Sequence, residues 1–217
     1  MDKFGVIFDM DGTMIDNMPY HNAAFVELHK RYNVPMADDF LPRTSGKTNN
    51  DIMPMIFGKD ISTERIAELA HEKESLYREL YRPQLKLVNG LRELLEEIKA
   101  AGIPMCVGSS APDENIDFVL DGLNIRSYFT AVINSSQITQ GKPHPEVFLK
   151  AAAAMNLTPE QCVVVEDAVL GVEAARNAGM AVMAISTIMP PERLQQADMV
   201  IKDFTEVNIY TFENLLN

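Results

Sequence analysis

The sequence predicts an α/β fold, in which a parallel sheet carries helices on both faces and an all-helical cap domain is inserted into the core. Three observations lead to this prediction. Short β-branched apolar runs recur along the 217 residues, helical patterns separate most of these runs, and one long interval contains helical patterns alone. The runs that predict buried strands cover residues 4–8, 103–107, 131–133, 162–165, 181–185 and 199–201.

The helical patterns between the strands are clearest in two places. Leu91, Leu94 and Leu95 mark one face of a helix that ends near Gly102, and a second apolar pattern covers residues 147–155. Right-handed strand–helix–strand units bring parallel strands together, so this alternation predicts a Rossmann-like sheet that is covered on both faces.

One interval breaks the alternation of strands and helices. About 75 residues separate the first strand from the next core helix, far more than an ordinary loop contains. Within it, Asn17 is expected to cap a helix with Pro19 in its first turn, and a second helix is expected from Ser62 to just before Pro83. We therefore expect a helical cap at residues 16–87 and an α/β core formed by residues 1–15 and 88–217.

The composition argues against several classes of protein. Hydrophobic residues make up 47% of the chain and charged residues 23%, so a sizeable core can form without cross-links. A net charge of -12 has the wrong sign for nucleic acid or an anionic membrane, and no apolar run approaches the roughly 20 residues of a membrane helix. The N-terminus does not resemble a signal peptide. We expect a cytoplasmic monomer, with Cys106 and Cys162 buried and reduced.

Acidic residues follow two of the predicted strands. Asp9 and Asp11 follow the first run, and Glu166 and Asp167 follow the run at 162–165. Ligands of an open parallel sheet collect at the carboxyl ends of its strands, so these side chains are expected to converge. Several buried carboxylates are unfavourable unless a cation lies among them, and oxygen ligands without His or Cys indicate Mg²⁺ rather than zinc.

Each acidic pair also has a simpler interpretation. Residues 9–13 could form a polar turn after a strand, and the pair at 166–167 could be the solvated start of a helix. Because both pairs occur at strand ends, the sequence favours the metal site.

Two further residues suit a phosphate group. Lys142 lies in a rigid loop between glycine and proline, and a fixed ammonium group beside carboxylates favours phosphate binding. Ser109 lies between a strand and the helix that opens near Pro112, where its hydroxyl and nearby amides could donate to phosphate oxygens. The simpler alternatives are a surface charge for Lys142 and a helix cap for Ser109.

These residues belong to four motifs that occur in order along the chain. The motifs are F-D-M-D-G-T at residues 8–13, V-G-S-S at 107–110, G-K-P-H-P-E at 141–146, and V-E-D-A-V-L-G-V-E-A-A-R-N-A-G at 165–179. In them the chain resembles the haloacid dehalogenase superfamily, most of all its β-phosphoglucomutase-like group. The resemblance covers nearly the whole chain, and it implies phosphoryl transfer through an aspartyl phosphate with Mg²⁺ as cofactor.

The resemblance also implies a role for each matching acidic residue. Asp9 would attack phosphorus as the nucleophile, and Asp11 would act first as a general acid and then as a general base. Mg²⁺ would be held by Asp9, the backbone carbonyl of Asp11, and Asp167. Glu166 would support the metal site.

Other residues of the same motifs would contact the phosphoryl group or the rest of the substrate. Lys142 and Ser109 would neutralise and orient the phosphoryl oxygens, since charge stabilisation and positioning supply most of the catalysis in this class of reaction. Gly12 and Ser110 are expected to lie against the substrate.

The cap should decide the substrate, because a helical lid that closes over the site excludes water and presents its own side chains. His21 and Lys73 match cap and hinge positions of the β-phosphoglucomutase-like group, where the histidine helps to link substrate binding to the acid/base. Either residue could instead be an exposed surface group, Lys73 especially because it lies between Glu72 and Glu74.

The chain departs from that group where a second phosphate would bind. Residues 46–50 read Gly-Lys-Thr-Asn-Asn and lack the arginine of the mutases, and residues 111–113 read Ala-Pro-Asp in place of Ser, Lys and Asn. A mutase must bind a bisphosphate in both orientations, so we expect a phosphatase that acts on a small phosphorylated metabolite, above all a sugar phosphate. Lys47 could replace the arginine, so a β-phosphoglucomutase-type isomerase is the alternative.

Three other functions have weaker support in the sequence. Residues 45–48 imitate the end of a Walker A loop, but the upstream glycine is missing and no strand precedes them. Residues 108–112 half-resemble the nucleophile elbow of a serine hydrolase, but proline replaces the second glycine. A relative that only binds a metabolite should have lost Asp9, Asp11, Lys142 or Asp167, and all four are present.

Overall fold

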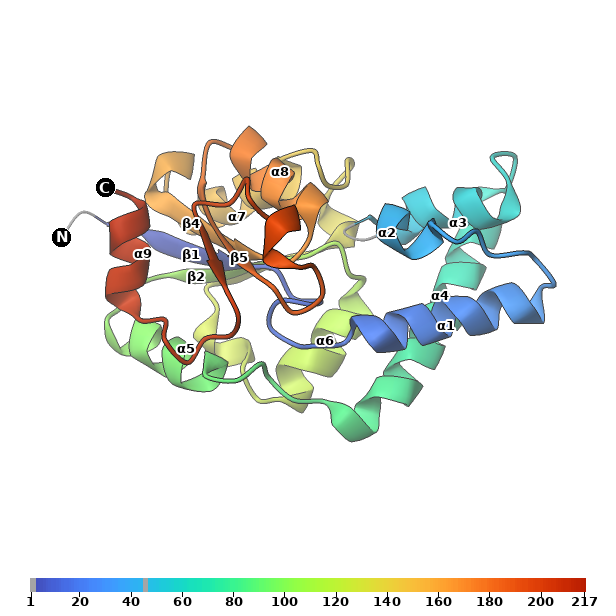
Figure 1. Ribbon diagram of the computed structural model, residues 1–217, viewed down its shortest axis with the longest axis horizontal. Helices are drawn as coiled ribbons and strands as arrows, with labels where there is room; N and C mark the ends of the chain where they lie inside the picture. The colour runs from blue at the N-terminus through green and yellow to red at the C-terminus, as the bar shows by residue number, and fades with distance from the viewer. Residues whose placement is uncertain (1–2, 45–46) are drawn as a thin grey trace.

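A single parallel sheet organises the chain in the computed structural model, which describes residues 3–44 and 47–217. Its six strands have the order β3-β2-β1-β4-β5-β6, and every pairing between neighbours is parallel (Figure 1). The strands are β1 (Gly5–Phe8), β2 (Met105–Gly108), β3 (Ala131–Ile133), β4 (Cys162–Glu166), β5 (Ala181–Ile185) and β6 (Met199–Ile201). All six predicted strands are therefore confirmed, with ends that differ by at most two residues.

Alternate residues of each central strand enter two different hydrophobic clusters. In β1, Val6 and Phe8 belong to one cluster and Ile7 to the other, as the two-residue repeat of a strand requires. The first cluster is covered by α5 (Leu91–Ala100), α6 (Asp113–Gly122) and α9 (Ile209–Leu215). The second is covered by α7 (Glu146–Ala154) and α8 (Val169–Asn177), so helices lie on both faces of the sheet (Figure 1).

The long interval after β1 contains helices and no strand among its described residues, and in Figure 1 these helices project beyond the end of the sheet. They are α1 (Met18–Arg31), α2 (Phe40–Thr44), α3 (Asn49–Phe57) and α4 (Thr63–Tyr81). Phe25, Leu28, Phe40, Met53 and Leu69 form part of their separate hydrophobic core. The two helices expected here are confirmed as α1 and α4, and the fold class is that predicted from the sequence.

The helical segment rests on the core through the last turns of α4. Tyr77 and Tyr81 are fully buried in the cluster that covers the first face of the sheet, and both rings contact Phe118 of α6. The chain leaves the sheet for the helical segment near Met14 and returns near Val88. These two connections are joined by a hydrogen bond from the amide of Val88 to the carbonyl of Met14 (2.9 Å). Short 3-10 turns complete the chain at Arg82–Gln84, Arg126–Tyr128, Ser135–Gln137, Pro159–Gln161 and Pro191–Arg193.

The starts of α1 and α4 show how far local sequence predicts local structure. The helix α4 begins where the sequence predicts it, and the Ser62 hydroxyl caps it by accepting from the amide of Arg65. Asn17 does stand at the N-cap position of α1, but its side chain makes no capping hydrogen bond, because it is engaged elsewhere. That part of the prediction is wrong.

In the part of the chain that the structure describes, no helix is long and apolar enough to cross a membrane. Ser45 and Gly46, which begin the Walker-like sequence, lie outside the described residues. Cys106 and Cys162 are buried free thiols, as predicted.

Candidate active site

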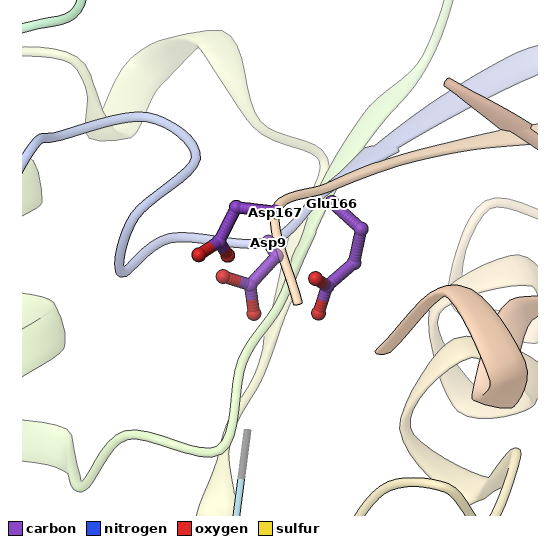
Figure 2. A group of neighbouring side chains, drawn as sticks. All are labelled: Asp9, Glu166 and Asp167. Atoms are coloured by element: carbon purple, nitrogen blue, oxygen red, sulfur yellow. The ribbon is translucent and has the colours of Figure 1, made fainter. Parts of the chain in front are cut away.

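The carboxyl ends of two adjacent strands, β1 and β4, supply the acidic residues of the site. Asp9 follows β1, Glu166 ends β4, and Asp167 comes next in the chain. The Asp9 amide donates to the carbonyl of Val165 (2.9 Å), so the backbone pairing of β1 and β4 continues into the site. Figure 2 shows the three carboxylates gathered beside these strand ends, as the sequence predicts. All three are buried, which excludes the solvated helix start as an interpretation of Glu166 and Asp167.

Lys142 reaches this cluster from the loop before α7. Its Nζ atom donates to Asp9 Oδ1 and to Glu166 Oε1, each at 2.6 Å, and the residue is only 3% exposed. Burial alone would lower the pKa of Lys142, but Asp9 and Glu166 outweigh it and hold that pKa above its ordinary value. The ammonium group therefore stays charged, and the interpretation of Lys142 as a surface charge is wrong.

The three carboxylates have the separation and charge of a site for a divalent cation. One oxygen of each of Asp9, Glu166 and Asp167 lies within 4.8 Å of the others. Burial raises the pKa of Asp9 to about 8 against the opposing charge of Lys142, and burial raises that of Asp167 well above its usual range. When ionised, these three carboxylates and the single ammonium group carry two excess negative charges. An ion such as Mg²⁺, which prefers oxygen ligands, fits this donor set.

Gly12 permits the close approach of two segments at this cluster. Its φ is +83°, and a Cβ atom at this position would lie 2.3 Å from Asp167 Oδ2. A side chain is excluded here by both backbone conformation and space. Asp167 is also fixed by the hydroxyl of Thr13, which donates to Asp167 Oδ1 (3.2 Å).

Asp11 is held apart from the three clustered carboxylates by a buried asparagine. The two amide hydrogens of Asn17 Nδ2 donate to Asp11 Oδ1 and to the Tyr77 hydroxyl, both at 2.6 Å, while Asn17 Oδ1 accepts from the amide of Gly12 (3.0 Å). The Asp11 side chain keeps 19% of its exposure. Sequence reasoning assigned Asn17 to helix capping and missed this role, although a polar residue so soon after the D-x-D-G-T motif was the available signal.

Asp9, Asp11 and Lys142 line a cavity, and a second polar cluster lies on the side of this cavity that α1 and α4 form. Lys73 Nζ is 2.7 Å from His21 Nδ1 and donates to Glu74 Oε1 (2.9 Å). Lys73 and His21 are 2% and 7% exposed, and the His21 ring stacks on Tyr77 with ring centres 3.7 Å apart. The alternative that these two residues are exposed surface groups is therefore wrong.

The hydrogen-bond roles of the two ring nitrogens of His21 follow from this geometry. A lysine ammonium can only donate, so Nδ1 accepts from Lys73 and any ring proton is on Nε2. The Nε2 atom is buried, has no hydrogen-bond partner among the described residues, and lies 3.5 Å from Asp11 Oδ1. Nε2 is thus the donor nitrogen of the ring, and Asp11 Oδ1 lies 3.5 Å from it.

The remaining predicted site residues line the same cavity. Ser109 follows β2 with its amide bonded to the carbonyl of Ile133 (2.9 Å), and its Oγ accepts from the amide of Ala111 (3.1 Å). Pro112 holds the N-cap position of α6, so Ser109 is not a helix cap. Ser110 and Lys47 also line this cavity. The fold therefore brings Asp9, Asp11, His21, Lys47, Lys73, Ser109, Ser110, Lys142, Glu166 and Asp167 around one space.

Comparison with known proteins identifies the family. A model of the haloacid dehalogenase-like hydrolase family matches residues 6–185. The chain belongs to this family. The family assignment confirms the resemblance given by the four motifs, and the chain is accordingly an enzyme of a hydrolase family.

Individual relatives of this haloacid dehalogenase-like hydrolase include both phosphatases and mutases. It is 34% identical to a phosphorylated carbohydrates phosphatase of Thermotoga maritima, over 81% of each chain. It is 29% identical to a β-phosphoglucomutase of Bacillus subtilis, over 94% of this chain and 91% of the relative. Among solved structures, a β-phosphoglucomutase of Clostridium difficile is 25% identical, with a TM-score of 0.88 over 99% of this chain and 97% of that one.

Proposed function

We propose that this protein is a Mg²⁺-dependent phosphatase that hydrolyses a small phosphorylated metabolite, above all a sugar phosphate, through an aspartyl phosphate on Asp9. The main support is the geometry around Asp9, whose buried carboxylate contacts Lys142 and adjoins two further carboxylates in one cavity. The similarity to the phosphatase of Thermotoga maritima supports a phosphorylated carbohydrate as the substrate.

Asp9 is the nucleophile of the proposed reaction. A carboxylate oxygen of Asp9 attacks phosphorus, and a second displacement by water then releases inorganic phosphate and restores the carboxylate. Lys142 favours the ionised form of Asp9 and carries the positive charge that the phosphoryl oxygens need. Ser109, at the end of the neighbouring strand, orients those oxygens through its hydroxyl.

Asp11 is the acid/base of the proposed reaction. It protonates the leaving oxygen in the first step and accepts a proton from the attacking water in the second. Asn17 holds one of its oxygens, and the Nε2 donor of His21 is near enough to complete the arrangement when the substrate binds.

Mg²⁺ would be held by Asp9, the backbone carbonyl of Asp11, and Asp167, with Glu166 supporting the site through Lys142 and the amide of Ala168. When bound, this ion supplies positive charge that offsets the carboxylates and polarises the phosphoryl group.

The segment that contains Lys47, Asn49 and Asn50 bears on the choice between hydrolysis and the transfer of phosphate within a hexose phosphate. The segment that carries an arginine in the mutases contains Asn49 and Asn50 in this chain. Asn49 donates a hydrogen bond to Glu74, and its uncharged amide supplies no cation for a second phosphate. These features favour a phosphatase. Lys47 lines the cavity and could bind a second phosphate, so an isomerase of the β-phosphoglucomutase type is the second candidate.

We propose further that residues 16–87 act as the cap over a core formed by residues 1–15 and 88–217.

The proposal is tested by the release of inorganic phosphate from acetyl phosphate and p-nitrophenyl phosphate. Release should require Mg²⁺ and should fall below detection in Asp9→Asn and Asp11→Asn, whereas Asp38→Asn, an exposed cap residue, should behave as the wild type. Activity that survives both substitutions contradicts the assignment. Conversion of β-glucose 1-phosphate to glucose 6-phosphate, primed with glucose 1,6-bisphosphate and faster than phosphate release, would favour the isomerase instead.

A further inference from the structure

Glu74 is a buried acid that the phosphoryl-transfer chemistry does not use. It lies on α4, is 5% exposed, and lines the same cavity as Asp9 and Asp11. Its position on the cap side of the cavity places it against the part of a substrate that lies beyond the phosphate.

Three donors from three helices hold the Glu74 carboxylate. Oε1 accepts from Lys73 Nζ and from Asn49 Nδ2, each at 2.9 Å, and Oε2 accepts from Asn115 Nδ2 at 2.7 Å. Arg78 donates to Asn115 Oδ1 (2.7 Å), and because a guanidinium group cannot accept, this contact fixes the amide of Asn115 with its NH₂ group towards Glu74. The carboxylate is therefore held in one orientation by both the cap and α6 of the core.

The charge of Glu74 is maintained in spite of its burial. Burial alone would raise the pKa of Glu74, but the charge of Lys73 and the hydrogen bonds from Lys73 and Asn115 outweigh it and lower that pKa to about 2. Lys73 is engaged by His21 as well as by Glu74, so the pair does not present a bare cation to the cavity.

The carboxylate also retains capacity to accept a hydrogen bond. A carboxylate offers about four acceptor sites, and the three described donors use three of them. A hydroxyl group of a bound substrate can occupy the fourth. A second phosphate or a carboxylate of the substrate brings no hydrogen for that site and meets the like charge of Glu74.

We propose that Glu74 determines which leaving group this enzyme accepts, by taking a hydrogen bond from a hydroxyl of an uncharged sugar or polyol and by repelling a leaving group with a second anionic group. This inference rests on the proposed phosphatase function and names the substrate class within it, which is the monophosphate of an uncharged polyhydroxylated compound.

The test compares two esters that differ in charge at one end. Glucitol 6-phosphate and 6-phosphogluconate share their chain length and phosphate position, but the first ends in a hydroxymethyl group and the second in a carboxylate. The wild type should have a kcat/KM for glucitol 6-phosphate that is at least about tenfold higher, and Glu74→Gln should reduce this preference by about tenfold or more. Glu79→Gln, an exposed glutamate of the same helix, should keep the wild-type preference.

A second variant, Glu74→Asp, keeps the negative charge but shortens the side chain, so it separates the effect of charge from that of side-chain length. It also leaves Lys73 with an acidic partner, so the test remains available if Glu74→Gln does not fold. Glu74→Asp should still discriminate against 6-phosphogluconate, while its KM for glucitol 6-phosphate rises by about tenfold because the carboxylate is withdrawn. A role confined to supporting Lys73 would leave the ratio of the two esters unchanged in both variants, and that result overturns the inference.

The failure of this inference can be told from the failure of the proposed function. If the wild type hydrolyses acetyl phosphate but prefers 6-phosphogluconate, or hydrolyses neither ester, the assignment of Glu74 is overturned and the phosphatase stands. If acetyl phosphate is not hydrolysed in the presence of Mg²⁺, the proposed function itself is overturned.

Discussion

Replacing Glu74 by Gln is expected to lower the free energy of unfolding at neutral pH, and the loss should shrink as the pH falls. The folded protein lowers the pKa of Glu74 from 4.5 to about 2. At about 1.4 kcal/mol for each pH unit, this shift corresponds to about 3 kcal/mol of stability when the carboxylate is ionised in both states.

The direction of the pH dependence follows from the sign of the shift. Because the folded pKa is below the unfolded pKa, the unfolded chain takes up a proton first as the medium is acidified. The contribution of Glu74 is therefore complete above pH 4.5 and is lost as the pH falls towards 2, with about half of it gone near pH 3. The glutamine variant cannot show this loss, so the difference between the two proteins narrows over this interval.

Urea unfolding followed by circular dichroism at pH 7, 5, 4 and 3 measures this difference, and far-ultraviolet detection suits a chain that contains no tryptophan. Glu79→Gln, exposed on the same helix, controls for the loss of a glutamate and should track the wild type at every pH. If the difference in the free energy of unfolding between the wild type and Glu74→Gln stays constant from pH 7 to pH 3, the reasoning is refuted. Such a result would mean that the charge of Glu74 contributes nothing to stability.

Three further outcomes are expected. Mg²⁺ should raise the melting temperature of the wild type and should have a much smaller effect on Asp167→Asn; equal shifts in thermal denaturation would argue against a metal site at Asp167. Gly171→Ala should lower kcat by about 100-fold, because the new Cβ would lie 1.8 Å from Oε1 of Glu166, whereas Glu173→Ala on the same helix should be unaffected in steady-state assays. Asn17→Ala should lower kcat by about 10- to 100-fold with little change in KM, since it releases the proposed acid/base; a change confined to KM would contradict that role.

The sequence predicted the core of the fold and the acidic part of the site for the same reason. Buried parallel strands are short apolar runs, and their carboxyl ends face one edge of the sheet, so residues such as Asp9 and Asp167 could be brought together without knowledge of the packing.

The helix α3 was not predicted, because it is short and contains Pro54, which breaks the expected helical pattern.

On the α1 and α4 side of the site, the sequence left two interpretations of His21 and Lys73 open, because the contacts there join residues that are far apart in the chain. In the sequence, Lys73 stands between two glutamates and resembles a solvated charge. In the folded protein it is buried against His21, 52 positions earlier, and Glu74 is held by Asn115, 41 positions later. Whether a charged side chain is buried depends on such partners, which a local pattern does not contain.

The amino-acid sequence by itself determined the order of the strands along the chain, the helical character of the interval after the first strand, and the acidic residues at the strand ends, because each of these depends on spacing over a few residues. Only the tertiary structure decided that Asn17 holds Asp11, that His21 Nε2 lies 3.5 Å from the same carboxylate, and that the buried Glu74 lines the cavity. These features depend on how the cap packs on the core, and the free energy of a buried polar group is fixed by the neighbours that this packing supplies.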